Sequence, residues 1–210
     1  WLAGRYEVSQ LQARIERDAA DAVSDIRTAM RRNVQSLQAL HYGDVRPQRW
    51  QREATQLLRE NREWVRLEWR DLDLRVLRAA DTPFRAPVFA RYGRAISQPE
   101  VMAACSVARR QSGPGYSRSN YISTKEGQGL EVMELCLPHL DSGRVSGYLV
   151  ASYSLNDMLF QMVPSALVQR QQVSFTEADG TRLATQGSLR EGSRIFSTQQ
   201  LLDLPSNTLV

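Results

Sequence analysis

The sequence has little lysine, cysteine and histidine: among its 210 residues are one lysine, two cysteines and two histidines. It also has no apolar run of 18 or more residues, which excludes a membrane-spanning helix within the sequence itself. It shows no signal-peptide pattern either. The sequence begins at Trp1, and we expect it to be part of a longer protein.

The few cysteines and histidines restrict metal and redox chemistry. Cys105 and Cys136 have no CxxC spacing, a pattern that favours two small buried thiols, with a disulfide as the alternative. With only His41 and His139 available, we expect no zinc site, and the sequence indicates no cofactor.

The charges are nearly balanced, with 27 basic residues against 23 acidic ones and a net charge of +4. Between Gln10 and Glu68 the arginines alternate with Asp and Glu, which is typical of solvated helix faces with i,i+4 ion pairs. A nucleic-acid binder concentrates uncompensated basic charge on one element, so we expect no nucleic-acid partner. The near-absence of lysine is typical of a GC-rich genome; alternatively, the guanidinium groups serve to bind carboxylates or phosphates.

Catalytic motifs are absent as well. The sequence contains no GxSxG elbow, P-loop, GxGxxG or HExxH pattern. Glu131 and Glu134 lie three positions apart on an expected strand, so their side chains point to opposite faces and cannot act as a carboxylate pair. We therefore expect this part of the protein not to be an enzyme.

The most regular feature of the sequence is its first segment. Apolar residues recur every three or four positions from Val8 to Leu40, no Gly or Pro interrupts residues Tyr6 to Tyr42, and Gly43 follows. A helix of that length spans about 54 Å at about 1.5 Å per residue. Such a rod is typical of a coiled-coil seam or of a spine that carries smaller domains.

The remaining sequence predicts helices mixed with hairpins. We expect a helix from Pro47, a hairpin around Asp71–Asp73, irregular chain over Thr82–Arg94, a helix from Ser97, a loop over Gln111–Asn120, central strands over Leu130–Leu137 and Arg144–Tyr153, a Ser154-capped helix, and a hairpin over Val173–Ala184. Strands joined by tight turns imply an antiparallel sheet, and we expect the helices on one side of it, in an α+β fold.

Several stretches together resemble a Cache-type (double PAS-like) sensor region of a bacterial transmembrane histidine kinase, similar to the dicarboxylate-sensing kinases. They are the long entry helix, "WVRLEWRDLDLRVLRA", "GPGYS", "LEVMELCLPHLDSGRVSGYLVASYSLNDML" and "VSFTEADGTRLA". The resemblance implies a signalling helix over residues 1–46, a membrane-distal PAS-like ligand-binding domain over 47–165, and a smaller or incomplete proximal PAS-like portion over 166–210.

The same resemblance implies a periplasmic sensor in a bacterial inner-membrane protein, flanked by transmembrane helices and dimeric through the long helix. A small organic ligand, a carboxylate or an amino acid, would bind the distal domain and bias a cytoplasmic kinase. The alternatives are the ligand-binding domain of a methyl-accepting chemotaxis receptor, or a structural or protein-binding ectodomain with its pocket filled by side chains.

Hydroxyl and guanidinium groups that suit an organic acid occur in three places. The candidate ligand-binding residues are Tyr116, Ser117, Arg118, Ser119 and Tyr121 after the Gly-Pro-Gly turn, Tyr148 and Ser152 on a central strand, and Arg94. The alternative is that the first group is merely a solvated loop, and that Tyr148 and Ser152 are core groups with internal hydrogen bonds.

Overall fold

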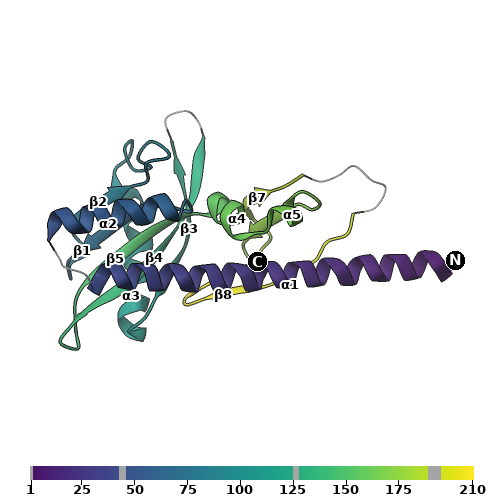
Figure 1. The fold of residues 1–210 in the computed structure, drawn as a ribbon, viewed down its shortest axis with the longest axis horizontal. Coiled ribbons are helices and arrows are strands. Elements are labelled where there is room, and N and C mark those ends of the chain that lie inside the picture. Colours follow the sequence, from purple (N-terminus) through teal and green to yellow (C-terminus); the bar gives the residue numbers. More distant parts are fainter. Residues whose placement is uncertain (1, 43–45, 125–127, 189–194) are drawn as a thin grey trace.

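The computed structural model describes residues 2–42, 46–124, 128–188 and 195–210. Figure 1 shows an elongated molecule in which one long helix runs along the long axis. A sheet domain lies against the C-terminal half of this helix, and smaller elements lie beside the middle of the helix. None of the helices in these ranges is both long enough and apolar enough to cross a membrane.

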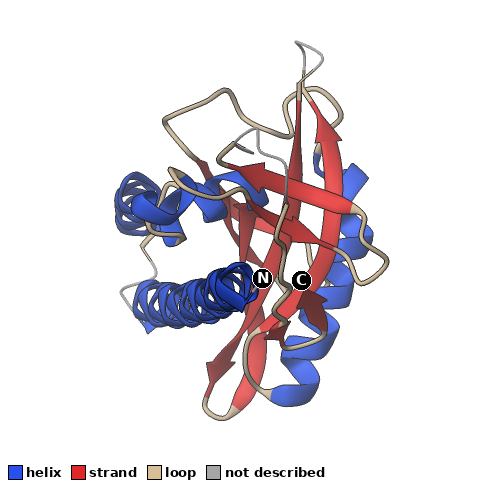
Figure 2. Ribbon diagram, turned by 90° about the vertical axis from the view of Figure 1, so that its right-hand side faces the viewer, coloured by secondary structure: helices blue, strands red, loops and turns tan. Residues whose placement is uncertain are grey.

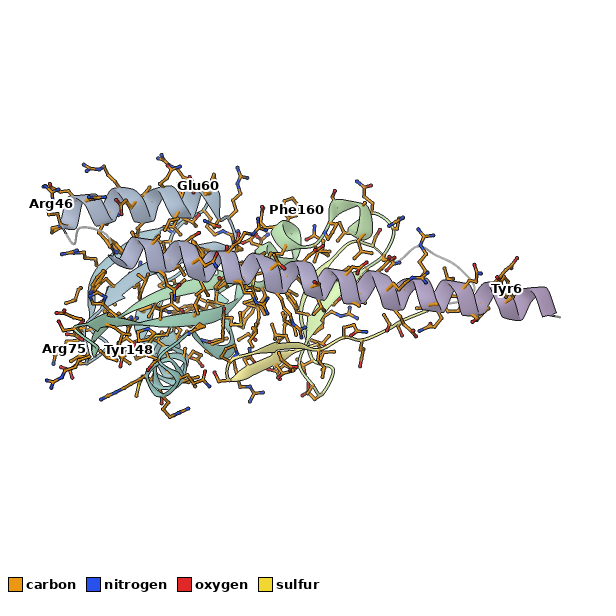
Figure 3. The ribbon with its side chains drawn as sticks, turned by 60° about the horizontal axis from the view of Figure 1, so that its bottom comes forward. Tyr6, Arg46, Glu60, Arg75, Tyr148 and Phe160 are labelled. Atoms are coloured by element: carbon orange, nitrogen blue, oxygen red, sulfur yellow. A yellow bond between two sulfur atoms is a disulfide. The ribbon has the colours of Figure 1, made fainter. Side chains whose placement is uncertain are left out.

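Helix α1 (Leu2–Tyr42) confirms the long helix predicted for Tyr6–Tyr42. Its buried apolar residues begin at Ala22 and follow the helical period through Ile26 and Met30 to Leu40. Tyr6 is exposed and marks the end of the helix that projects away from the sheet domain (Figure 3). Gly43, expected to end the helix, lies outside the described residues.

A five-stranded antiparallel sheet forms the centre of the molecule, in the order β2-β1-β5-β4-β3. The strands are β1 (Trp64–Arg70), β2 (Val76–Asp81), β3 (Gly115–Ser123), β4 (Gly129–Asp141) and β5 (Arg144–Ser154). The hairpins predicted around residues 71–73 and 141–143 are confirmed, and so is the irregular chain between β2 and η1 (Arg94–Ser97).

The loop predicted over Gln111–Asn120 is wrong for most of its length, because β3 begins at Gly115 and pairs with β4. A register shift between Tyr116 and Ser119 breaks the regular alternation of inward and outward residues there. That irregularity explains why the polar residues of β3 do not read as a strand in the sequence. Gly115 is required because a Cβ would lie 2.2 Å from the Ala104 carbonyl oxygen of the adjoining helix.

Helices cover both faces of the sheet, which corrects the expectation of helices on one side. Figure 2 shows α1 and α2 (Pro47–Glu60) on one side of the strands and α3 (Gln98–Gln111) on the other. The two faces therefore bury different residues: α1 and α2 pack against Leu67, Leu135 and Ala151, whereas α3 packs against Tyr148 and Val150.

A disulfide joins α3 to the sheet, which corrects the expectation of two free buried thiols. Cys105 of α3 and Cys136 of β4 are bonded, with their Cα atoms 5.1 Å apart. The two cysteines are 31 residues apart in the sequence, and only the packing of α3 on β4 brings them together.

The chain after β5 forms smaller elements along α1. They are α4 (Leu155–Met162), α5 (Ser165–Val168), β6 (Val173–Thr176), β7 (Arg182–Gln186), β8 (Leu202–Leu204) and β9 (Asn207–Leu209). Ser154 caps α4 as predicted, since its hydroxyl accepts a hydrogen bond from the Asp157 backbone N–H. The predicted β6–β7 hairpin is confirmed. The turn between β8 and β9 contacts the large sheet through a bond from the Tyr116 N–H to the Pro205 carbonyl.

Candidate ligand site on the charged sheet face

One face of the five-stranded sheet carries charged side chains that are buried beneath α3 and the segment 82–97. We call it the charged face. Residues paired across antiparallel strands point to the same side, and this defines the face on the three central strands. Its residues are Arg66, Glu68 and Arg70 of β1, Tyr148, Val150 and Ser152 of β5, and Glu134 and Cys136 of β4.

Glu68 is the most connected group of the charged face. Its side chain is fully buried, and its carboxylate accepts hydrogen bonds from the Nε atoms of Arg66 at 2.6 Å, Arg70 at 2.8 Å and Arg94 at 3.0 Å. Burial by itself would raise the pKa of Glu68, but the charges of Arg94 and Arg70 outweigh it and the pKa lies below its ordinary value. Glu68 is therefore a buried carboxylate that stays ionised.

Glu134 forms the second centre of the charged face. Arg94 binds it through two parallel hydrogen bonds, from Nη1 at 2.6 Å and from Nη2 at 2.9 Å, the geometry in which a guanidinium fits a carboxylate best. The Ser152 hydroxyl donates to Glu134 Oε2 at 2.7 Å. The Glu134 backbone N–H donates to the Ser117 hydroxyl at 2.9 Å, which ties β3 to the same point.

The charges around these two centres are balanced. Arg66 Nη1 also contacts both carboxylate oxygens of Asp81, at 2.8 and 2.9 Å, and Arg70 Nη1 donates to the Leu74 carbonyl and to the Gln98 side chain. Leu74 has a positive φ of 61°, a conformation that non-glycine residues rarely adopt, and it places that carbonyl in the turn between β1 and β2. Three cations therefore match three anions: Arg66, Arg70 and Arg94 against Glu68, Asp81 and Glu134.

The structure brings three of the predicted ligand-binding residues together and places a fourth nearby. Arg94, Ser152 and Ser117 surround Glu134, at the contacts given above. Tyr148 lies on the same face, buried beside α3 (Figure 3). Ser119 lies on β3, and its buried hydroxyl has no hydrogen-bond partner among the described residues.

The other predicted site residues do not reach the charged face. Tyr116 pairs with Leu135 and belongs to the apolar core on the opposite face, where burial raises the pKa of its hydroxyl. Arg118 is 76% exposed and lies 3.3 Å from Glu177, beyond the large sheet. Tyr121 is also exposed.

Sequence reasoning missed Glu68, Glu134, Arg66 and Arg70 as site residues. The signal was present on β1, where charged residues alternate with apolar ones, but such alternation normally marks a strand with one solvated face. Here α3 and segment 82–97 cover that face, and no local pattern in the sequence predicts that these segments pack there.

A separate cavity of about 660 Å³ lies away from the charged face, beside the first half of α1. Residues of α1, the α4–β7 region and the chain from Ile195 to Leu202 line it, including Ile15, Phe175 and Phe196. None of the predicted ligand-binding residues lines this cavity. In the described residues, no group of three or more His, Cys, Asp or Glu side chains could hold a metal ion.

No known family profile and no curated protein matches the sequence. Solved structures do match in three dimensions. The ligand-binding domain of the Pseudomonas aeruginosa amino acid chemoreceptor PctB, in complex with L-Arg, has 15% identity and a TM-score of 0.55 over 83% of this chain and 70% of that one. The domain of the Pseudomonas fluorescens chemoreceptor CtaA, in complex with L-isoleucine, has 13% identity and a TM-score of 0.53 over 86% and 70%.

A third similar structure comes from another organism. The ligand-binding domain of a Campylobacter jejuni chemoreceptor, in complex with L-norvaline, has 8% identity and a TM-score of 0.56 over 84% of this chain and 70% of that one. These likenesses define the class: the chain has the α+β fold of a Cache-type ligand-binding domain. The predicted fold class is confirmed.

Proposed function

We propose that this chain is the extracytoplasmic sensor domain of a bacterial membrane receptor, and that it binds a small organic ligand over the charged face. The observation that carries the proposal is the meeting of Glu68, Glu134 and Ser152, from three adjacent strands, beneath a covering segment. Buried ion networks contribute little net stability compared with apolar residues of the same size. This network lies between the sheet and the segment that covers it, where the resemblance to Cache-type sensors implies a ligand, and this favours recognition over a purely structural role.

The chemistry of this face suits a ligand that carries both charges. Its guanidinium groups bind carboxylates bidentately, and its buried carboxylates and the Ser152 hydroxyl accept ammonium or guanidinium donors. The solved neighbours PctB and CtaA are described with amino acids bound, which supports an amino acid or a related carboxylate here.

The disulfide supports the location. Disulfides persist in oxidising compartments such as the bacterial periplasm, so the bond between Cys105 and Cys136 is expected of a periplasmic domain. The further elements of the proposal are a homodimer through α1, flanking transmembrane helices, and the division at residues 46 and 165. For the output, the neighbours are chemoreceptor domains, so a chemotaxis receptor fits at least as well as a histidine kinase.

A second candidate function is a structural or protein-binding ectodomain. One observation favours it: the space over Glu68 and Glu134 holds the side chain of Arg94, so the chain fills its own charged face. Under this alternative the network only fixes the covering segment to the sheet.

A thermal-shift screen with a panel of amino acids and organic acids tests the proposal. We expect at least one compound to raise the Tm by about 3 °C or more at saturating concentration. Glu134→Gln should remove that rise, and the matched variant Glu131→Gln, on the same strand but the opposite face, should keep it. If no compound of the panel shifts the wild-type protein, the ligand-sensor proposal is wrong and the structural alternative stands.

A further inference from the structure

Arg94 differs from the other cations of the charged face in where it comes from. Arg66 and Arg70 belong to strand β1, whereas Arg94 belongs to the segment that covers the sheet. Gly93, directly before it, has a φ of 70°, which favours glycine, and nothing lies within 4 Å of the position of a Cβ there. The backbone thus turns at Gly93 and directs the next side chain down onto the strands.

The surroundings of Arg94 provide one hydrogen-bond acceptor for each donor of its guanidinium group. A guanidinium has five N–H donors in a fixed plane. In Arg94, Nε donates to Glu68, Nη1 to Glu134 Oε1 and to the Ser97 hydroxyl, and Nη2 to Glu134 Oε2 and to the Ser152 hydroxyl. Five donors therefore meet five acceptors.

An aromatic ring completes these surroundings. The Arg94 guanidinium carbon lies 4.3 Å from the centre of the buried Phe89 ring, a contact that favours a flat, weakly hydrated cation. Two carboxylates, two hydroxyls and a ring face are the parts from which proteins build sites for guanidinium ligands.

Most of this site belongs to the sheet and would remain if Arg94 left it. Glu68, Glu134 and Ser152 are strand residues with side chains held in the sheet interior. Without Arg94, two arginines would face three carboxylates, so the vacated position would carry a net negative charge. The position would then accept one cation with the outline of a guanidinium.

We propose that the charged face is a guanidinium site which the chain occupies with its own Arg94, and that a ligand carrying a guanidinium group competes with Arg94 for Glu68 and Glu134. This inference rests on the proposed function, since it names the class of ligand for the same site. A tethered group competes at an effective concentration on the order of mM, so a free guanidinium compound binds the wild type more weakly than a protein from which the Arg94 side chain has been removed.

Chemical rescue of Arg94→Ala tests this inference. We expect the variant to unfold at a lower temperature than the wild type. Ethylguanidinium at about 20 mM should then raise its Tm by about 3 °C or more, saturably. The neutral N-ethylurea, nearly the same in size and shape, should have no such effect. Agmatine, a longer guanidinium compound, should bind Arg94→Ala at least about tenfold more tightly than the wild type.

The matched control is Arg91→Ala, three residues earlier on the same segment. Arg91 is exposed and contacts the Tyr92 ring and the Thr124 carbonyl instead of the sheet carboxylates. We expect ethylguanidinium to leave the Tm of this variant unchanged. Equal effects of ethylguanidinium and N-ethylurea on Arg94→Ala, or equal rescue of both variants, would overturn the inference.

A measurement on the wild type covers the case in which Arg94→Ala does not fold. Agmatine titrated to about 50 mM should shift the NMR resonance of the Arg94 Nε–H and leave that of Arg91 in place, because displacement frees Arg94 from Glu68. An unmoved Arg94 resonance overturns the inference. If ethylguanidinium rescues Arg94→Ala but no compound shifts the wild-type protein, the guanidinium site is upheld and the sensor function is refuted. If a compound shifts the wild type in a Glu134-dependent way but ethylguanidinium does not rescue Arg94→Ala, the sensor function is upheld and the guanidinium site is refuted.

Discussion

The two faces of the five-stranded sheet are both covered by other elements, but they bury side chains of different polarity. Towards α1 and α2, the central strands present Leu67, Met133, Leu135 and Ala151, which are nearly or fully buried in one continuous apolar cluster. Towards α3 and segment 82–97, the neighbouring positions on the same strands present Glu68, Glu134 and Ser152, which are just as buried. These positions are therefore equally buried on the two faces, and they differ in polarity.

This difference gives the two faces different physical requirements. Apolar side chains associate without directional requirements, so the face towards α1 holds that helix with little demand on geometry. The charged face holds together only while each cation meets its anion, and removal of one group leaves another buried and unpaired. A small molecule that changes one of these pairs can therefore act on the charged face far more strongly than on the apolar one.

The largest effect is expected from breaking the charged face at Glu134. Glu134→Ala removes both bonds to Arg94 and leaves that guanidinium mostly buried without its main partner. We expect a loss of about 3–5 kcal/mol in the free energy of unfolding, measured by urea denaturation. Glu131→Ala, on the opposite face of the same strand, should change it by less than about 0.5 kcal/mol. Similar losses in both variants would contradict the assignment of a buried ion network to one face.

A smaller effect on stability, which depends on pH, is expected from Glu63 and Glu68. These two glutamates are five residues apart in the sequence and lie on opposite sides of the sheet. Glu63 accepts a 2.6 Å hydrogen bond from the Asn33 amide of α1, with Asp157 as a nearby like charge. Burial dominates and raises the pKa of Glu63 above its ordinary value, whereas the pKa of Glu68 is lowered by its arginines.

The signs of the two stability contributions are therefore opposite. A raised pKa in the folded state means that Glu63 contributes fully at low pH and loses this contribution as the pH rises through the raised value. Glu63→Gln keeps an acceptor for Asn33 without the charge, so we expect a higher Tm than the wild type at pH 8 and little difference at pH 4. Glu68→Gln should instead lose stability above the ordinary carboxyl pKa, and the deficit should shrink as the pH falls through the lowered pKa. Thermal melts across pH 3.5–8 measure both, and curves of the same slope would contradict the comparison.

The smallest effect on stability is expected at Arg118. This residue was predicted from the sequence to bind the ligand, but the structure places it on the surface. Its side chain is 76% exposed and its pairing with Glu177 is 3.3 Å long. Arg118→Ala should cost less than about 1 kcal/mol of stability, by urea denaturation, and should leave ligand-induced shifts intact. A ligand-induced shift that disappears in Arg118→Ala would return this residue to the site and move the site away from the charged face.

The sequence predicted the elements far better than the site. The period of α1, the Pro47 helix start, the turns at residues 71–73 and 141–143 and the Ser154 cap all depend on neighbours within a few residues, and all are confirmed. The strand over Gly115–Ser123 was missed because its pairing partner β4 and its register shift are not local properties. Ser152 was a candidate because a hydroxyl on a central strand needs a hydrogen-bond partner, and Arg94 because of its guanidinium group. Nothing in the sequence joined either residue to Glu68 or Glu134.

What the sequence determined by itself is the set of pieces: a helix of about 54 Å at about 1.5 Å per residue, an α+β pattern of hairpins and helices, and an arginine-rich composition without catalytic motifs. The tertiary structure alone decided which face of the sheet is charged, that Cys105 bonds Cys136, and that Arg94 lies between two carboxylates. The reason is physical. Periodicity reports whether a side chain points to one face or the other, whereas burial and ion pairing depend on what packs over that face, here α3 and segment 82–97, which come from elsewhere in the chain.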